Sequence, residues 1–185
     1  MGHSQAEKAA SRERVLRIAA RKIRQDGMSG PGVAEIMREA GLTHGGFYKH
    51  FASRDDLIAQ AAAAALTEVS TAVEQLAGKS GQEQRAGIID AYLAKEHRDN
   101  PATGCALVTL GTAAGRGDLA LKEAYEKRVR GYLDRFGGKD SEEARAEALL
   151  TLSALVGATL LARAVADPSL SDELLDTVAK QLKQH

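Results

Sequence analysis

The sequence predicts an all-α fold. The amino-acid composition, the spacing of proline residues and the absence of strand-like alternation all support that prediction. Alanine occurs 34 times and leucine 21 times in the 185 residues, and tryptophan is absent. The three prolines, Pro31, Pro101 and Pro168, leave long uninterrupted segments between them, which favours helix almost everywhere. No segment combines apolar and polar alternation with β-branched and aromatic enrichment, so no strand is expected.

Glycine, proline and capping residues divide the chain into about nine expected helices. Gly27 and Gly41 stand where helix ends require a left-handed residue, and Ser53 and Ser141 stand at helix starts. The expected helices cover 5–25, 33–40, 43–51, 54–77, 82–97, 103–114, 119–136, 141–166 and 172–184.

Length and charge limit the class of protein. A chain of this size folds as one or two small domains, and 44% apolar with 27% charged residues excludes a mainly disordered chain. No run approaches the roughly 18 apolar residues that cross a bilayer, one cysteine forms no internal disulfide, and the start lacks the pattern of a secretory signal. We therefore expect a soluble cytoplasmic protein with no membrane partner.

The basic and acidic residues balance at 25 each but are unevenly distributed. Residues 1–60 carry 10 Lys and Arg against 7 Asp and Glu, whereas the remainder carries 15 against 18. The excess in the first third is a weak hint of nucleic acid, and chance variation on solvated helices explains it equally well.

The segment 33–51 has the helix, glycine turn, helix pattern of a helix-turn-helix. In that motif the N-terminal end of the second helix, here 44–50, meets base edges in the major groove. A plain helical hairpin fits the bare pattern too. However, Gly45 and Gly46 inside a short helix cost on the order of 2 kcal/mol relative to alanine. Close approach of the backbone to DNA explains that cost.

From Arg14 to Ile58 the sequence resembles the DNA-binding domain of TetR-family transcriptional regulators. The resemblance rests on the apolar helix that ends at Gly27, on the run Ala-Gly-Leu-Thr-His-Gly-Gly-Phe-Tyr-Lys-His-Phe at 40–51, and on Ser-Arg-Asp-Asp-Leu at 53–57. It covers about 45 residues without gaps. The resemblance implies an N-terminal helix-turn-helix domain over 1–53 and an effector-binding and dimerisation domain over 54–185.

The resemblance also implies roles for individual residues. Positions used at the major groove are matched by Thr43, His44, Gly45, Gly46 and Tyr48, and positions near phosphates by Lys49, His50 and Arg54. Family members commonly place a hydroxyl residue before the second helix, but Pro31 and Gly32 stand there. The missing hydroxyl leaves one phosphate contact in doubt, although the backbone N–H groups of Val33 and Ala34 can bind a phosphate oxygen.

The last two expected helices suit a homodimer through residues 148–166 and 171–184. Leucine and valine lie nearly all round the first of them, so it must be buried on more than one side. The small residues Ala154, Gly157, Ala158 and Ala162 admit a partner helix closely. A purely intramolecular core is the alternative, but a two-fold operator calls for a two-fold protein.

Cys105 is the candidate sensor. It follows Pro101 to Gly104 at the expected start of a helix, and a helix N-terminus stabilises a thiolate, with His97 and Arg98 close in sequence. Some members of the resembled family sense oxidants or electrophiles through a similarly placed Gly-Cys. The alternative is a small buried apolar residue. Further pocket candidates, chosen by helix position, are Tyr92, His97, Leu107, Thr109, Tyr125, Tyr132 and Thr159.

The expected effector is small or apolar, because the second domain is mostly aliphatic. No catalytic motif, metal-ligand spacing or cofactor-binding loop is present, so we expect no enzyme, no metal and no cofactor. The sequence therefore predicts a homodimeric regulator, a repressor, that leaves a palindromic operator on DNA when a small-molecule or thiol-reactive effector binds. Two rivals remain: a ligand-binding or electrophile-scavenging helical protein with a vestigial helix-turn-helix, and a structural dimer.

Overall fold

The structure is a computed structural model that describes residues 5–30, 32–68 and 81–184. Those residues contain helices and no strand, so the all-α prediction is confirmed. The elements are α1 (Gln5–Asp26), α2 (Val33–Glu39), the 3-10 helix η1 (His44–Lys49), α3 (Arg54–Thr67), α5 (Gly81–Tyr92), α6 (Lys95–Asp99), the 3-10 turn η2 (Pro101–Thr103), α7 (Ala106–Arg116), α8 (Leu119–Arg135), α9 (Glu142–Ala164) and α10 (Pro168–Gln184).

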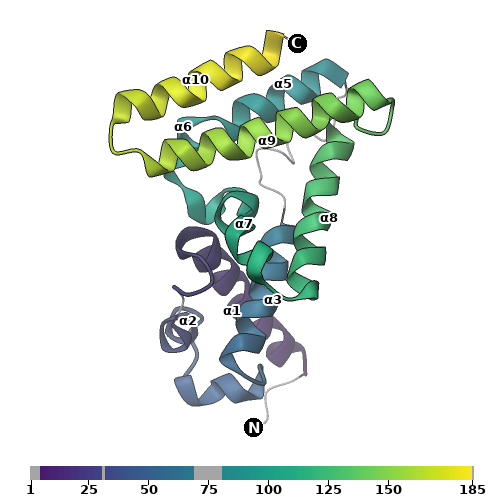
Figure 1. Cartoon of the computed structure of the whole chain (residues 1–185). Helices are drawn as coiled ribbons and strands as arrows, with labels where there is room; N and C mark the ends of the chain where they lie inside the picture. Colours follow the sequence, from purple (N-terminus) through teal and green to yellow (C-terminus); the bar gives the residue numbers. More distant parts are fainter. Residues whose placement is uncertain (1–4, 31, 69–80, 185) are drawn as a thin grey trace.

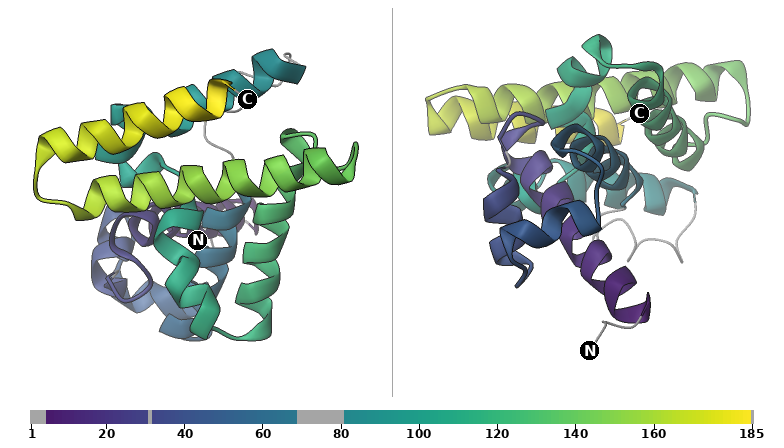
Figure 2. Two further views of the ribbon diagram at one scale, coloured as in Figure 1. Left: turned by 45° about the horizontal axis from the view of Figure 1, so that its top comes forward. Right: turned by 90° about the horizontal axis from the view of Figure 1, so that it is seen from below.

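The helices form a small N-terminal group and a larger C-terminal group (Figure 1). α1, α2, η1 and α3 lie together at one end of the molecule, and α9 and α10 run side by side across the other end next to α5. α7 and α8 lie between the two groups and contact both α3 and α9. The second view in Figure 2 shows α9 extending across the full width of the molecule. One apolar core runs through both groups.

The predicted helix ends are largely confirmed. Gly27 and Gly41 adopt φ of 76° and 72°, the left-handed conformation that only glycine takes without strain. The side chains of Ser53 and Ser141 accept hydrogen bonds from the backbone N–H groups of Asp56 and Ala144, so both residues cap helices.

The expected helix over 54–77 is confirmed for Arg54–Thr67 and is wrong at Glu68. α3 ends at Thr67, because Glu68 is extended with φ −63° and ψ 128°; residues 69–77 lie outside the described residues. The expected start of a helix at 103 is wrong as well. There Pro101–Thr103 form a 3-10 turn, and α7 begins at Ala106 with Cys105 as its N-cap.

The expected single helix over 82–97 is broken into α5 and α6. Ala94 is extended, with φ −64° and ψ 145°. The imidazole Nδ1 of His97 lies 2.5 Å from the backbone oxygen of Tyr92. A side chain therefore contacts a carbonyl that would otherwise accept a hydrogen bond within a continuous helix.

α9 is the central helix of the C-terminal group. Its 23 residues are long and apolar enough to cross a membrane by length and composition. In the fold, however, it packs against α5, α6, α7, α8 and α10. Such packing is what a core helix of a helical protein requires, and the helix needs no membrane to cover the faces that meet these neighbours.

The core at the junction predicts a contrast between two leucines. Leu110 is fully buried in α7, whereas Leu119 at the start of α8 is 71% exposed. Leu110→Ala should lower the free energy of unfolding by about 2–5 kcal/mol, and Leu119→Ala should change it by less than about 0.5 kcal/mol. Urea denaturation at one fixed protein concentration measures both. Equal effects would contradict the burial described here.

Candidate functional site

The segment that the sequence predicts to read DNA is an exposed 3-10 helix held by one buried aromatic ring. Phe47 is 2% exposed and stacks on Phe51 with 5.7 Å between ring centroids. This anchor turns Tyr48 outward, where its side chain is 76% exposed. Thr43, His44, Gly45 and Lys49 are exposed as well, while Gly46 and His50 are half-buried. The structure thus brings the predicted residues 43–50 onto one face.

Two details differ from the sequence prediction. The segment is a 3-10 helix rather than an α-helix, which is physically reasonable because Gly45 and Gly46 weaken α-helix formation. Thr43 precedes the segment at the position where a capping hydroxyl is common, but its side chain makes no cap hydrogen bond.

The glycine pair is not explained by packing inside the protein. A Cβ atom added at Gly45 would meet nothing within 4 Å, and one added at Gly46 would make ordinary contacts, the nearest being 3.6 Å from the Thr43 hydroxyl. Neither glycine has a positive φ. The remaining explanation for glycine at positions 45 and 46 is that another molecule must approach this backbone closely.

Positive charge from α1 surrounds this face. Burial first, and then the cations Lys8, Arg12 and Lys49, lower the pKa of His50. Lys8 and Lys49 also line a hollow of about 700 Å³ beside η1. The sequence analysis did not single out Lys8 or Arg12, because their proximity to η1 arises only when α1 folds against it.

The start of α2 is the position where a capping hydroxyl is missing. Gly32 is the N-cap, with extended backbone and no side-chain cap hydrogen bond, and Pro31 lies outside the described residues. α2 is instead held by ion pairs to α1, including 2.6 Å between Lys22 Nζ and a Glu35 carboxylate oxygen. Arg54 lies at the start of α3, near the Ser29 carbonyl, at 3.5 Å.

Cys105 lies in a closed cluster in the C-terminal group rather than in an open pocket. Its side chain is buried, and its backbone N–H donates to Nε2 of His97 at 2.9 Å. His97 Nε2 therefore accepts while Nδ1 faces the Tyr92 carbonyl, which fits the neutral imidazole with its proton on Nδ1. Burial lowers the pKa of His97 to about 4.

The expected activation of the thiol by His97 and Arg98 is not supported. His97 is neutral near pH 7, and the Arg98 guanidinium pairs with Asp99 at 2.7 Å and Asp172 at 2.6 Å. Arg163, which the sequence analysis missed, is the cation at this cluster. It donates to the backbone oxygens of His97 and Arg98 at 2.6 and 2.9 Å.

The aromatic neighbours of Cys105 were expected to line a pocket. Tyr92 is 3% exposed, and its ring lies 4.7 Å from His97 and 5.9 Å from Tyr132 between centroids. Burial first, and then the neighbouring Cys105, raise the pKa of Tyr92. Among the described residues its hydroxyl finds no hydrogen-bond partner. The Tyr92 hydroxyl is therefore a buried polar group, next to the Cys105 thiol, that can still form a hydrogen bond.

The other predicted effector residues are separated. Tyr125 donates to the Leu107 carbonyl at 3.1 Å, and buried Thr159 donates to the Leu155 carbonyl within α9 at 2.9 Å. Thr109 faces the opposite direction and donates to the Arg24 carbonyl of α1 at 2.8 Å. The predicted effector residues therefore do not line one pocket. Most of them lie in the core, and Thr109 instead joins the two groups of helices.

Arg24 makes further polar contacts at the junction of the two groups. Its guanidinium donates to the Ala102 carbonyl in η2 at 2.8 Å and pairs with the Glu68 carboxylate at 2.6 Å. Ala102 is three residues before Cys105. A displacement of Cys105 and η2 therefore reaches the last turn of α1 directly.

An apolar stripe runs along the free face of α9. Leu149, Leu150, Leu160 and Leu161 are 45%, 67%, 51% and 51% exposed. Gly157 lies between the two leucine pairs, and a Cβ added there would meet nothing within 4 Å. Contiguous exposed leucines of this kind are typical of a surface that another protein covers.

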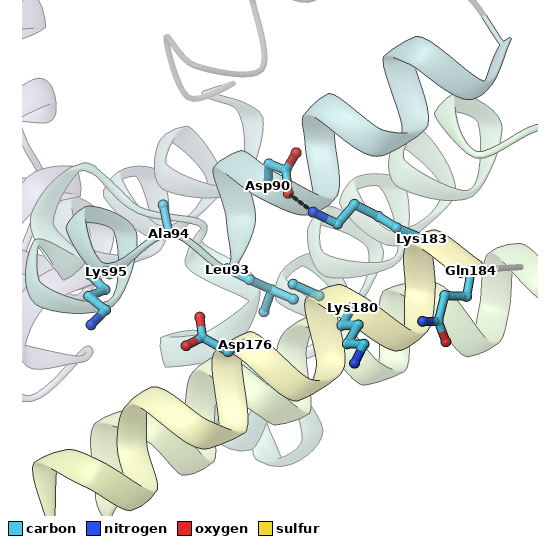
Figure 3. A pocket seen from close by; sticks show the side chains of 9 residues that line it. Asp90, Leu93, Ala94, Lys95, Asp176, Lys180, Lys183 and Gln184 are labelled. Atoms are coloured by element: carbon cyan, nitrogen blue, oxygen red, sulfur yellow. Dashed lines mark hydrogen bonds and ion pairs between the residues drawn. The ribbon is translucent and has the colours of Figure 1, made fainter.

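A groove with a volume of about 560 Å³ lies between α5 and α10 (Figure 3). Lys183 on α10 reaches across it to Asp90 on α5, with 2.6 Å between the charged atoms. Asp176, Lys180 and Lys95 also line it, and Lys95 pairs with Asp172 outside the lining. The groove therefore presents charges of both signs.

Comparison with known proteins matches the N-terminal part of the chain to a known family. Residues 15–61 match the sequence profile described as "Bacterial regulatory proteins, tetR family". No curated protein matches the chain.

Solved structures of TetR regulators have the same fold as this chain. A TetR regulator from Chloroflexus aurantiacus is 22% identical, with a TM-score of 0.78 and 98% of each chain covered. A TetR regulator from Legionella pneumophila is 19% identical, with a TM-score of 0.74 over 100% of this chain and 98% of that one. The reduced form of NemR from E. coli is 19% identical, with a TM-score of 0.73 over 95% and 96%. Residues 15–61 are therefore similar to the N-terminal segment of TetR-family regulators, and the chain has the fold of the solved TetR regulators.

Proposed function

We propose that this regulator is a homodimeric, non-enzymatic, cytoplasmic repressor that an effector releases from a palindromic operator. Residues 1–53 form its DNA-binding domain, and residues 54–185 bind the effector and the second subunit. The observation that carries the proposal is the exposed face of η1, where Tyr48 projects beside a glycine pair that packing within the chain does not require.

The proposed contacts follow from exposure and charge. Thr43, His44, Gly45, Gly46 and Tyr48 meet base edges, and Lys49, His50 and Arg54 lie near phosphates, with Lys8 and Arg12 adding positive charge. Backbone at Gly45 can approach DNA closely because no side chain separates the two. The vestigial alternative is less well supported, because a protein that no longer bound DNA would have no use for these exposed residues.

The proposed dimer uses residues 148–166 and 171–184, with the α9 leucines at its centre. A second copy covers the stripe, and Gly157 allows the two α9 backbones to approach closely. Two η1 segments then meet successive major grooves about 34–36 Å apart on a two-fold operator.

The proposed sensor is Cys105, with the neighbouring Tyr92, His97, Tyr125 and Thr109 as candidate effector contacts. An adduct on the buried sulfur adds volume where Tyr92 and His97 already pack closely. Relief of that crowding displaces η2, and the hydrogen bond from Arg24 to Ala102 carries the displacement into α1. The effector favours the state with η2 displaced, which is the condition for any release.

The first experiment is a mobility shift on the DNA upstream of the protein's own gene, at physiological salt. Tyr48→Ala should weaken binding by roughly 5- to 150-fold for a lost base contact of about 1–3 kcal/mol, and Lys49→Ala should weaken it through a lost phosphate contact. Lys49→Ala should also lower the salt slope by about 1 if Lys49 meets a phosphate. Lys139→Ala, on an exposed lysine paired with Asp134 in the other group of helices, is the control. Unchanged affinity in both η1 variants would remove η1 from the interface.

The dimer predicts a second result. Leu161→Glu places a charge in the apolar stripe and should shift the protein to monomer in analytical ultracentrifugation. Leu119→Glu, on a leucine 71% exposed but outside α9, should leave the dimer intact. A dimeric Leu161→Glu protein would place the subunit interface elsewhere.

The sensor predicts a third result. Cys105→Ser should keep operator affinity while losing release by N-ethylmaleimide, because the serine hydroxyl does not form the thioether. The readout is the mobility shift before and after treatment, with mass spectrometry to count adducts. Normal release of the variant would reduce Cys105 to a packing residue.

A further inference from the structure

A second hollow in the C-terminal group differs in charge from the groove of Figure 3. It lies between the end of α3 and the middle of α8 and has a volume of about 320 Å³. The buried side chains of Leu66 and Tyr132 belong to its lining, and Lys127, Arg128 and Arg135 line it as well. Its lining contains three cations and no carboxylate.

Among the described residues, no carboxylate neutralises these three cations. Within residues 5–30, 32–68 and 81–184, no carboxylate forms an ion pair with Lys127, Arg128 or Arg135. The Arg128 guanidinium lies over the Tyr132 ring, 4.7 Å from its centroid. By contrast, Arg130 of the same helix pairs with Glu126, with 2.8 Å from its Nε to the carboxylate. Unpaired charge therefore collects on the side of α8 that faces the hollow.

Gly131 lines the same hollow and independently suggests that something occupies it. It lies inside the 17-residue α8, where glycine weakens a helix relative to alanine, and its φ is not positive. A Cβ added there would meet nothing within 4 Å. Neither conformation nor packing requires glycine, but a Cβ would occupy space beside the hollow that Gly131 lines.

We propose that this hollow binds a small organic carboxylate with an apolar body. The guanidinium groups of Arg128 and Arg135 pair with the carboxylate, and the apolar body lies against Leu66 and Tyr132. The inference rests on the proposed function, for which it names an effector class. It also revises the sequence expectation of a mostly aliphatic pocket, because the effector carries a charge.

The position of the hollow couples it to DNA binding. Leu66 and Thr67 are in the last turn of α3, and α3 packs against α1 of the DNA-binding domain as well as against α8. A carboxylate held by α8 fixes the end of α3 relative to α8. This second route to α1 is separate from the Cys105 route, which runs through η2 and Arg24.

The test uses octanoate as the probe. The control 1-octanol has a similar apolar body without the charge, and the control inorganic phosphate has negative charge without the apolar body. Thermal unfolding is followed by circular dichroism on the full chain. Octanoate at millimolar concentration should raise Tm by a few degrees in a concentration-dependent manner, because a ligand that binds only the folded state stabilises it. Octanol should leave Tm unchanged, and phosphate should raise it less than octanoate does.

Variants locate the effect. Arg128→Met and Arg135→Met should lose most of the octanoate shift, and Arg130→Met, two residues from Arg128 and outside the hollow, should keep it. Gly131→Leu should raise the Tm of the free protein through better helix formation and yet lose the shift. An octanoate shift of equal size in Arg128→Met and Arg135→Met, or none in the unaltered protein, would overturn the inference.

The mobility shift separates this inference from the proposed function. Specific operator binding that octanoate weakens, with the weakening lost in Arg128→Met, supports both. Specific operator binding without any octanoate effect keeps the regulator and overturns the carboxylate as its effector. A Tm shift that depends on Arg128, without specific operator binding, overturns the regulatory function and leaves a carboxylate-binding protein.

Discussion

The contact made by Arg24 joins the two groups of helices, and the rest of the structure depends on it. Its guanidinium is drawn out of water at the end of α1 and donates to a backbone oxygen of η2, while Glu68 at the end of α3 neutralises its charge. Thr109 of α7 bonds to the carbonyl of the same residue. One residue of α1 thereby meets three other segments. Because buried charged groups keep fixed partners, the orientation of α1 cannot change without changes at η2 or α3.

This arrangement explains why two different sites can influence one surface. Cys105 adjoins η2, and the basic hollow adjoins the end of α3, so each lies beside a different partner of Arg24. In the proposed mechanism, the closed surroundings of Cys105 suit a small reagent that reacts once it enters. The open, cationic hollow suits a molecule that binds reversibly. The two proposed inputs would give separate responses to a reactive reagent and to a carboxylate.

The sequence predicted the N-terminal group in detail because its signals are local. The glycine ends at Gly27 and Gly41, the Ser53 cap and the inward position of Phe47 each depend on neighbours only a few residues away. Apart from Phe47, the η1 residues lie exposed or half-buried at the surface, and their role on DNA stays a prediction. The sequence analysis missed the 3-10 geometry. It interpreted Gly45 and Gly46 only as allowing DNA to approach the backbone, and it did not consider that two glycines also disfavour an α-helix.

The C-terminal group could not be predicted to the same degree, because its features depend on contacts between distant segments. The break at Ala94 depends on the imidazole of His97, which satisfies a carbonyl that the helix pattern assigns to a backbone partner. Arg163 and Arg24 act on residues 65 and 78 positions away, and nothing in local spacing reveals such pairs. The basic hollow was missed for a related reason: Arg128 and Arg135 resemble ordinary solvated charges until α3 is placed beside α8.

The 3-10 form of η1 changes how far its side chains are spaced along the axis. A 3-10 helix rises about 2.0 Å per residue against 1.5 Å in an α-helix, so the six residues of η1 extend over roughly 12 Å instead of 9 Å. Residues three apart are eclipsed in this geometry, which aligns Tyr48 with Gly45. The phenol ring has bare backbone beside it at Gly45, while its other neighbour is the Phe47 ring, with 5.1 Å between centroids. In the proposed complex, the longer η1 segment would spread its side chains over a longer stretch of the major groove than an α-helix of six residues.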